Sequence, residues 1–304
     1  MGLVEMKYCG LSIESRKLRG VCIGDSDSLI DSFVEELDQS LDPVERVKEP
    51  LSKWQKALEG CDRLGVAVPG LVTAKGRITH SALIPEHSGL EFAKAISERT
   101  GKEVLLENDA NCAAYGELQL GAGRGSGDMF YITLGEGVGG AFIFGGKIWR
   151  GTAGFAGEFG YVPIDADGNR LEDMASAANI VRRTRSRLHT DNTTSLAQKG
   201  EDNIELDDII IAAEQGDEFA RMMIERTGTY VGVAAASVIN LLNIESIIIG
   251  GSTMRAGELL LDAVKGRARE LSFEPAFDTT KFSIGELGDN AAALGAALLC
   301  RAES

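Results

Sequence analysis

Apolar positions along this chain recur with two different spacings, which predict strands interleaved with helices. Near the N-terminus, YCGLSI and LRGVCI are short apolar runs joined by a polar turn, a pattern typical of a β-hairpin. Over residues 43–58 the apolar residues stand three and four positions apart, as one buried face of a helix requires. RLGVAVPG then predicts a buried strand that ends at Pro-Gly.

The alternation continues through the rest of the chain. A helix over 90–99 closed by Gly101, a strand over 103–106 and a helix over 110–120 precede the glycine-rich connector GAGRGSGD, where we place a domain boundary. Beyond it, MFYITL, AFIF and KIW predict strands joined by the turns GEGVGG and GG. SIIIGG predicts a further strand, and helices are predicted over 171–188, 206–226, 230–242, 259–269 and 291–300. The pattern predicts an α/β protein of two domains.

The net charge of the chain limits the classes of partner that it is expected to bind. Lys and Arg number 31 against 46 Asp and Glu, a net charge of −15 over 304 residues. This acidity argues against nucleic acid, whose phosphates need a basic face, and against an anionic membrane. No apolar run approaches the roughly 20 residues of a membrane span. We interpret most of the acidic excess as a contribution to solubility, and expect neither a nucleic-acid nor a membrane partner.

The cysteines and the N-terminus indicate a cytoplasmic protein. No secretory signal is visible in MGLVEMKYCG, and a chain of this length needs no disulfides to stabilise its core. The cysteines are odd in number and without CxxC spacing, so we predict apolar core residues at Cys9, Cys22, Cys61, Cys112 and Cys300.

The other candidate side chains favour structural roles. The histidines are isolated in polar stretches, which predicts surface positions for His80, His87 and His189. Trp54 and Trp149 fit core or interface positions, and residues 182–187 predict a solvated basic helix face.

Candidate chemistry begins at LLENDANCAAYGE, where a buried strand ends and a helix begins. Asn108 and Asp109 lie at this junction, so a carboxylate there gains from the helix dipole. Two interpretations stay open at about even odds: a catalytic base, or a helix N-cap with no further role.

Glycine-rich turns form the second group of candidates. Residues 131–146 read strand, glycine turn, strand, and glycines let backbone N–H groups approach phosphate oxygens; a plain hairpin is the alternative. Residues 247–261 suit a nucleotide's sugar or base, or a tight strand–helix corner. Glu158 stands among small residues in RGTAGFAGEFGYVP, which suits polyol binding or a solvated loop.

The order and wording of seven segments resemble the ROK family of bacterial sugar kinases and sugar-responsive repressors. The segments are VAVPGLV, ENDANCAAYGE, ITLGEGVGG, RGTAGFAGEFGY, LEDMASA, NIESIIIGGS and LGDNAAALGAA, from about residue 7 to 297. The resemblance implies an actin-like, ribonuclease-H-like α/β fold of two lobes, with sugar and ATP in the cleft between them. It places one lobe at residues 1–120, joined by a returning helix at 289–304, and the other at 121–288.

The resemblance also implies roles for individual residues. Asp109 matches the catalytic base. Sugar contacts are implied at Gly70, Asn108, Glu158, Tyr161 and Glu172, and nucleotide contacts at Lys17, Gly135, Glu136, Gly137, Gly139, Gly140, Gly250 and Gly251. The implied reaction transfers the γ-phosphoryl group of Mg-ATP to a sugar hydroxyl, with Asp109 taking the hydroxyl proton. The resemblance further implies a homodimer.

This sequence departs from the family pattern in its first hairpin. Ser12 replaces an aspartate, and Glu14, Ser15 and Arg16 replace small turn residues; Lys17 agrees. Glu136 similarly replaces a threonine in the glycine turn. A glutamate about 4 Å from a phosphate would cost about 4 kcal/mol before screening. Either a glutamate holds the magnesium, or Arg16 and Lys17 reach the phosphates.

The residues that the resemblance assigns to sugar binding also depart from the family pattern. Tyr161 replaces the histidine of the family's zinc site and the loop lacks cysteines, so no structural zinc and no protein-bound metal are expected. Leu83 replaces an asparagine that contacts sugar, which predicts a preference other than glucose, or none.

Two functions of different class follow: an ATP-dependent sugar kinase, and a sugar-binding or regulatory protein with an impaired ATP site. A repressor is disfavoured, because the first strand begins by about residue 7 and leaves no room for a helix-turn-helix.

Overall fold

The computed structural model describes residues 6–73, 77–81, 84–188 and 193–302. They divide into two units, each with its own dense set of contacts. Unit 1 comprises 1–125, 141–156 and 287–304, and unit 2 comprises 126–140 and 157–286. Residues 141–156 thus group with unit 1, whereas the predicted boundary between residues 120 and 121 places them in the other lobe.

Unit 1 is built on a five-stranded mixed sheet. Its strand order is β3-β2-β1-β4-β7. The hairpin expected from the first apolar runs is confirmed, because β1 and β2 pair antiparallel, whereas β4 and β7 run parallel to β1. The strands are β1 Tyr8–Ile13, β2 Lys17–Ile23, β3 Leu29–Glu36, β4 Arg63–Val68 and β7 Glu103–Asn108, with a two-stranded ribbon of β5 Leu71–Val72 and β6 Ile78–His80 beside them.

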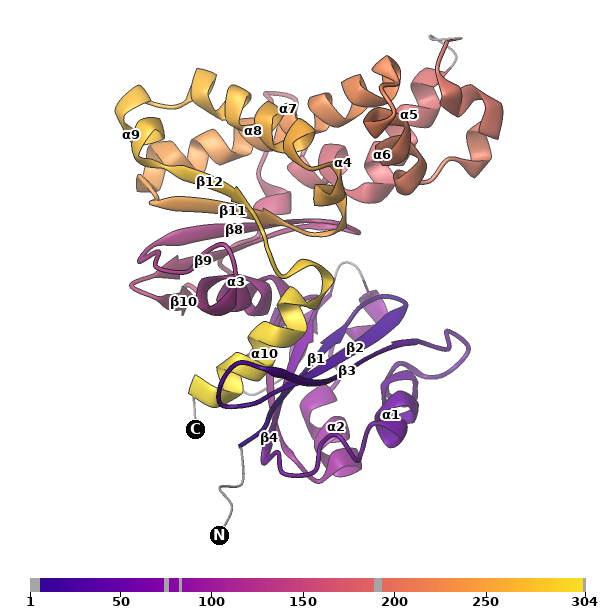
Figure 1. Ribbon diagram of the computed structural model, residues 1–304, viewed down its shortest axis with the longest axis vertical. Coiled ribbons are helices and arrows are strands. Elements are labelled where there is room, and N and C mark those ends of the chain that lie inside the picture. The colour runs from indigo at the N-terminus through magenta and orange to yellow at the C-terminus, as the bar shows by residue number, and fades with distance from the viewer. Residues whose placement is uncertain (1–5, 74–76, 82–83, 189–192, 303–304) are drawn as a thin grey trace. The chain divides into compact units, whose positions relative to one another are not determined.

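Helices cover both faces of this sheet (Figure 1). On one face, α1 (Pro43–Lys53) and α2 (Phe92–Thr100) bury their apolar stripes, with Leu51 and Phe92 nearly inaccessible to solvent. On the other, α10 (Ala291–Ala302) lies on β1 and β4 and against α3 (Asp109–Leu120). Contact here is backbone on backbone: a Cβ at Gly10 or Gly65 would meet a carbonyl oxygen of α10 at 2.0 Å. The helix expected at 291–300 is confirmed.

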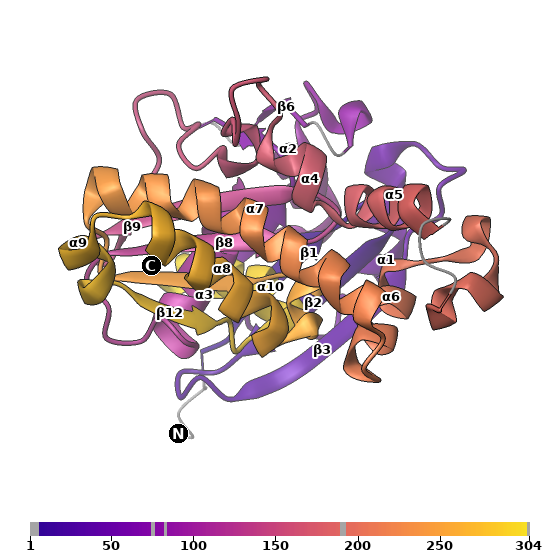
Figure 2. The same cartoon turned by 90° about the horizontal axis from the view of Figure 1, so that it is seen from above.

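The second sheet has the order β10-β9-β8-β11-β12, and β9 runs through the boundary between the units at residues 140 and 141. β8 and β12 flank β11 in parallel. The strands are β8 Met129–Leu134, β9 Val138–Phe144, β10 Lys147–Trp149, β11 Ser246–Gly250 and β12 Lys281–Ile284. In unit 2, α7 (Glu218–Leu242) and α8 (Glu258–Leu271) run side by side (Figure 2).

Three predicted boundaries in unit 2 were wrong. The helix expected over 171–188 breaks at Ser176, where the backbone is extended. The helix expected over 206–226 breaks at Gly216, whose φ of 90° interrupts it. α7 then continues past Gly228, because that glycine packs on α8 and does not end the helix. The helices are α4 Leu171–Ala175, α5 Ala177–Arg187, α6 Leu206–Glu214, α7 Glu218–Leu242, α8 Glu258–Leu271 and α9 Glu274–Thr279, and the 3-10 turns are η1 Pro85–His87, η2 Phe159–Tyr161, η4 Ser195–Lys199, η5 Glu201–Asn203, η6 Ser252–Ala256 and η7 Gly288–Asn290.

The prediction that disulfides are absent was wrong for one pair of cysteines. Cys9 and Cys22 stand opposite each other in the register of β1 and β2 and are joined by a disulfide. Residues 13 positions apart become neighbours because the hairpin folds back on itself, a relation that CxxC spacing does not reveal. The other three cysteines are buried thiols, as expected.

The expectation of a surface position was wrong for His87. His87 is buried, since η1 places it over Phe92 with ring centroids 4.6 Å apart, whereas His80 is exposed as predicted and His189 lies outside the described residues. Trp149 is half exposed and packs on Phe142 and Phe144, while Trp54 is buried beside Phe33. Within the described residues, no helix combines the length and hydropathy that crossing a membrane requires.

Candidate active site

The corner between β7 and α3 brings three of the predicted site residues together. Asn108 is the N-cap of α3, and its Oδ1 accepts the backbone N–H of Asn111 at 3.0 Å. Its Nδ2 donates to the Gly70 carbonyl and to Asp109 Oδ1, both at 3.1 Å. The capping role therefore belongs to Asn108. Asp109 is the first helical residue, where the helix dipole favours an ionised carboxylate.

Gly70 is required by the backbone at this corner. Its φ is 130°, and a Cβ would lie 2.6 Å from the carbonyl oxygen of His80. Ser81 fixes the same point from the other side, because its buried hydroxyl donates to the Pro69 carbonyl at 2.8 Å and accepts the Ile84 N–H at 3.2 Å. Segment 84–88 is thereby tied to Gly70. Leu83 lies outside the described residues.

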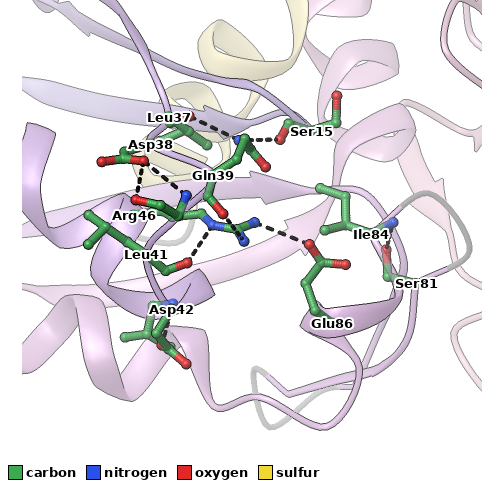
Figure 3. Close-up of polar contacts among 12 residues, drawn as sticks. Ser15, Leu37, Asp38, Gln39, Leu41, Asp42, Arg46, Ser81, Ile84 and Glu86 are labelled. Carbon is green, nitrogen blue, oxygen red and sulfur yellow. Dashed lines mark hydrogen bonds and ion pairs between the residues drawn. The ribbon is translucent and has the colours of Figure 1, made fainter.

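Arg46 holds this segment to the loop after β3 (Figure 3). Its guanidinium donates to the carbonyls of Leu41 at 2.8 Å and Gln39 at 3.0 Å, and to Glu86 Oε1 at 3.1 Å. The pKa of the Glu86 carboxyl is lowered, first by a hydrogen bond from its own backbone and then by Arg46. Gln39 Nε2 donates in turn to the Ser15 carbonyl at 3.2 Å, so a polar chain connects the β1–β2 turn with η1.

Glu14 and Lys17, at the two ends of the β1–β2 turn, each form an ion pair. Lys17 starts β2, and its Nζ lies 3.6 Å from Glu36 of β3, with both side chains largely exposed. Glu14 Oε1 lies 3.4 Å from Arg19 Nε, and Arg19 also contacts Asp289 at 3.3 Å. An exposed pair such as Lys17–Glu36 contributes about 0–1 kcal/mol, so an incoming phosphate can displace Glu36.

In unit 2, the glycine turn is shorter than the pattern predicted. Gly135 N donates to the Gly137 carbonyl at 3.0 Å, which leaves Glu136 exposed at the tip. Gly139 and Gly140 are strand residues of β9, and a Cβ at Gly140 would lie 2.6 Å from Cζ of Phe130 and 2.9 Å from Cβ of Phe159. The Gly135 carbonyl accepts Ala177 N at 2.8 Å, which brings the start of α5 to the turn.

A cavity of about 650 Å³ opens beside that start of α5. Arg182, Arg185, Asp202 and Ile204 contribute to its walls, together with Ala177 itself. This cavity is wide open to solvent, and its walls combine apolar and charged side chains.

Gly250 and Gly251 close β11 against β8. A Cβ at Gly250 would lie 2.3 Å from Tyr131 Oη, and one at Gly251, whose φ is 92°, would lie 2.4 Å from the Leu134 carbonyl oxygen. Close packing alone accounts for both glycines.

The predicted sugar carboxylates lie on either side of η2. Glu158 caps η2 and is exposed, while Glu172 in α4 accepts the Val138 N–H at 3.0 Å and so joins α4 to β9. Tyr161 lies under the Arg170 guanidinium, 4.5 Å from ring centre to Cζ. The loop between them contains neither cysteine nor histidine, so its residues do not fit a zinc ion. Asp165 and Asn169 close it instead with a side-chain hydrogen bond of 2.7 Å.

Sequence comparison decides the family. A family model described as ROK family matches residues 35–303, most of the chain. This chain belongs to the ROK family.

Among ROK relatives, a glucokinase of Halalkalibacterium halodurans is 30% identical over 262 residues, covering 83% of this chain and 79% of that protein. A xylose repressor of Caldicellulosiruptor bescii is 27% identical over 82% of this chain and 65% of its own length. The solved ROK glucokinase of Streptomyces griseus, in complex with glucose and AMPPNP, is 27% identical with a TM-score of 0.87, covering 97% of this chain and 99% of that one. The fold is therefore the α/β actin-like ATPase fold of this family.

Two residues at the β7–α3 corner were missed. Glu107 stands immediately before Asn108 and is buried, and Arg150 pairs with it. The letters ENDAN contained the glutamate, but nothing in the spacing connects it with an arginine 43 positions later.

Proposed function

We propose that the protein transfers the γ-phosphoryl group of Mg-ATP to a hydroxyl of a hexose or N-acetylhexosamine. The arrangement of Gly70, Asn108 and Asp109 carries the proposal, because it fixes a carboxylate at a helix N-terminus beside the backbone turn at Gly70. The similarity to glucokinases supports the same reaction class.

In this reaction Asp109 takes the proton of the attacking hydroxyl. Its Oδ1 accepts the Ala110 N–H at 2.9 Å and the Asn108 amide at 3.1 Å, so the carboxylate is held in place before substrate arrives. We expect Asn108 and Gly70 to contact the sugar, and the family pattern implies further contacts at Glu158 and Glu172. Positioning and electrostatics supply most of the acceleration in phosphoryl transfer.

The nucleotide would use backbone groups of the Gly135–Gly137 turn and the cavity beside α5. Lys17 would exchange its exposed partner Glu36 for a phosphate oxygen. Arg19 offsets the charge of Glu14, which reduces the repulsion that this substitution alone would cause.

One observation favours a second function, a sugar-binding or regulatory protein with an impaired ATP site. Glu136 is exposed at the tip of the glycine turn, where a negative charge opposes a triphosphate. ROK relatives include xylose repressors as well as kinases.

Product formation decides between the two. Purified protein is incubated with Mg-ATP and a panel of hexoses and N-acetylhexosamines, and ADP release is followed by a coupled assay. Sugar-dependent ADP release that Asp109→Asn abolishes supports the kinase. Absence of turnover with the whole panel contradicts it, and absence of ATP binding by calorimetry then supports the second function.

The cytoplasmic location, the homodimer and the lack of a structural zinc stay predictions. They would be tested respectively by fractionation of the source cells, by light scattering and by metal analysis of the purified protein.

A further inference from the structure

Arg150 follows β10 directly, and its guanidinium reaches the β7–α3 corner. Its Nε lies 2.7 Å and its Nη2 2.6 Å from Glu107 Oε2. Two donors of one planar group thus converge on a single carboxylate oxygen, a geometry that an ammonium group cannot reproduce. Both residues belong to unit 1.

Glu107 is buried, with 8% of its surface exposed, and its other oxygen is also fully used. Oε1 accepts the Asn108 backbone N–H at 2.8 Å and the Asn111 Nδ2 at 3.0 Å. A buried carboxylate needs a charged partner and hydrogen-bond donors, and Arg150 and the two asparagines supply them to Glu107.

Asp109 lies between these two asparagines in the sequence. Asn108 caps α3 by accepting the Asn111 N–H, and it donates to Asp109 directly. Glu107 therefore accepts hydrogen bonds from both ends of segment 108–111, whose second residue is Asp109. We propose that Arg150 is a positioning residue for Asp109, acting through Glu107; this rests on the proposed kinase function.

Electrostatic contact supports this arrangement. The pKa of the buried Cys112 thiol is raised well above its ordinary value, first by burial and then by the charges of Glu107 and Asp109, while Arg150 lowers it. The charges of all three residues therefore reach one point inside the first turns of α3. Arg150 also starts the loop that leads to Glu158, and its carbonyl accepts Ala156 N at 3.2 Å.

The first test compares Arg150→Met, Arg150→Lys and a matched control. Arg63→Met breaks an Arg–Glu pair of 3.0 Å at the opposite end of the same strand, β7. Arg150→Met should lower kcat about 10- to 100-fold while the KM for Mg-ATP stays within about twofold, because only the base is misplaced. Arg150→Lys should recover part of kcat, and Arg63→Met should leave kcat unchanged.

Added guanidinium ion provides a rescue. The Arg150 side chain is 46% exposed, so a small cation can enter the site it vacates. Millimolar guanidinium should raise kcat of Arg150→Met but not that of Arg63→Met, with equal sodium chloride as the ionic-strength control. Unchanged kcat in Arg150→Met, or a loss matched by Arg63→Met, overturns the proposal.

Hydrogen exchange supplies a readout independent of turnover. In Arg150→Met, the amides of Ala110 and Asn111 should exchange at least about tenfold faster, with the amides of α2 unchanged. If Arg150→Met does not fold, Glu107→Gln replaces it, with the same expected result. Unchanged exchange at these amides, or an equal acceleration across unit 1, overturns the positioning role. A wild-type protein inactive on every sugar refutes the kinase function alone, and the exchange result still decides the role of Arg150.

Discussion

Two corners of the molecule carry the candidate chemistry, and they are held in different ways. At the β7–α3 corner of unit 1, side chains fix side chains: Glu107, Asn108 and Asn111 form a network around Asp109. At the β8–β9 turn and the end of β11 in unit 2, glycines allow close backbone contacts instead, and Gly251 leaves no room for a Cβ.

The difference agrees with the roles that we propose for the two corners. A general base has to hold one oxygen within hydrogen-bond distance of one proton, which requires a network with few alternative arrangements. A phosphate group needs room and N–H donors, which glycines provide by removing side chains. Substitutions should therefore affect rate at the first corner and folding at the second.

The largest effect is expected from Asp109→Asn. Removing the proton acceptor while keeping the shape should lower kcat about 10³-fold, or about 4 kcal/mol, with the melting temperature nearly unchanged. Steady-state ADP release measures it. Asp62→Asn, the same change at an exposed site of unit 1, serves as the control, and a comparable loss there would contradict the assignment.

Gly251→Ala tests the second corner. The φ of 92° and the 2.4 Å approach to the Leu134 carbonyl oxygen predict a loss of about 3 kcal/mol in the free energy of unfolding. Urea unfolding measures it. Gly135→Ala is the matched variant, because its Cβ would first meet Ser252 Oγ at 3.4 Å and no positive φ opposes it. Equal losses in the two variants would refute the role given to close packing.

His87 gives unit 1 a sensitivity to acid. Burial lowers its pKa from 6.5 to about 4, against a smaller opposing effect of Glu86. Below pH 6.5 His87 is protonated in the unfolded chain but stays neutral in the folded chain until the pH approaches 4. Its contribution to the free energy of unfolding is therefore fully present above pH 6.5 and declines toward pH 4. Between pH 7.5 and 5 the loss should be about 2 kcal/mol.

Comparison with His87→Phe isolates this contribution from that of the carboxylates. Urea unfolding of both proteins at pH 7.5 and 5 should show the extra acid sensitivity in the wild type alone. Identical pH dependence would show that His87 is protonated in the folded protein.

The smallest effect is expected from Arg46→Met. Loss of its three hydrogen bonds should cost about 1 kcal/mol of stability and raise the KM for sugar about threefold, because η1 is released from the loop after β3. Lys53→Met, which breaks the exposed pair with Glu35, is the control. A KM that changes equally in both variants would exclude a specific role for Arg46.

Periodicity predicted most elements because their faces differ in burial. β8 and β10 have the predicted bounds, and α3 differs by one residue at its start. β3 escaped prediction because LIDSFVEE is largely exposed on both faces, so no alternation of apolar and polar residues marks it. Its partner β2 defines it as a strand, and that information is not local.

The site was predictable where a motif is continuous along the chain. Asn108 and Asp109 are adjacent, and their contact with Gly70 agrees with the expected grouping. Arg150 and Arg46 were not predictable, because each acts across a long sequence separation on a residue with no distinguishing pattern. The disulfide between Cys9 and Cys22 depends in the same way on register.

The glycine contacts beneath α10 have a consequence for biosynthesis. Helix α10 leaves the ribosome after all of unit 2, yet it covers the face of the sheet that carries Gly10 and Gly65. Until α10 arrives, the apolar side chains of Val21 and Ile23 on this face lack the helix that buries them in the finished protein. Unit 2 can therefore complete its fold first, and unit 1, although it begins the chain, is finished last.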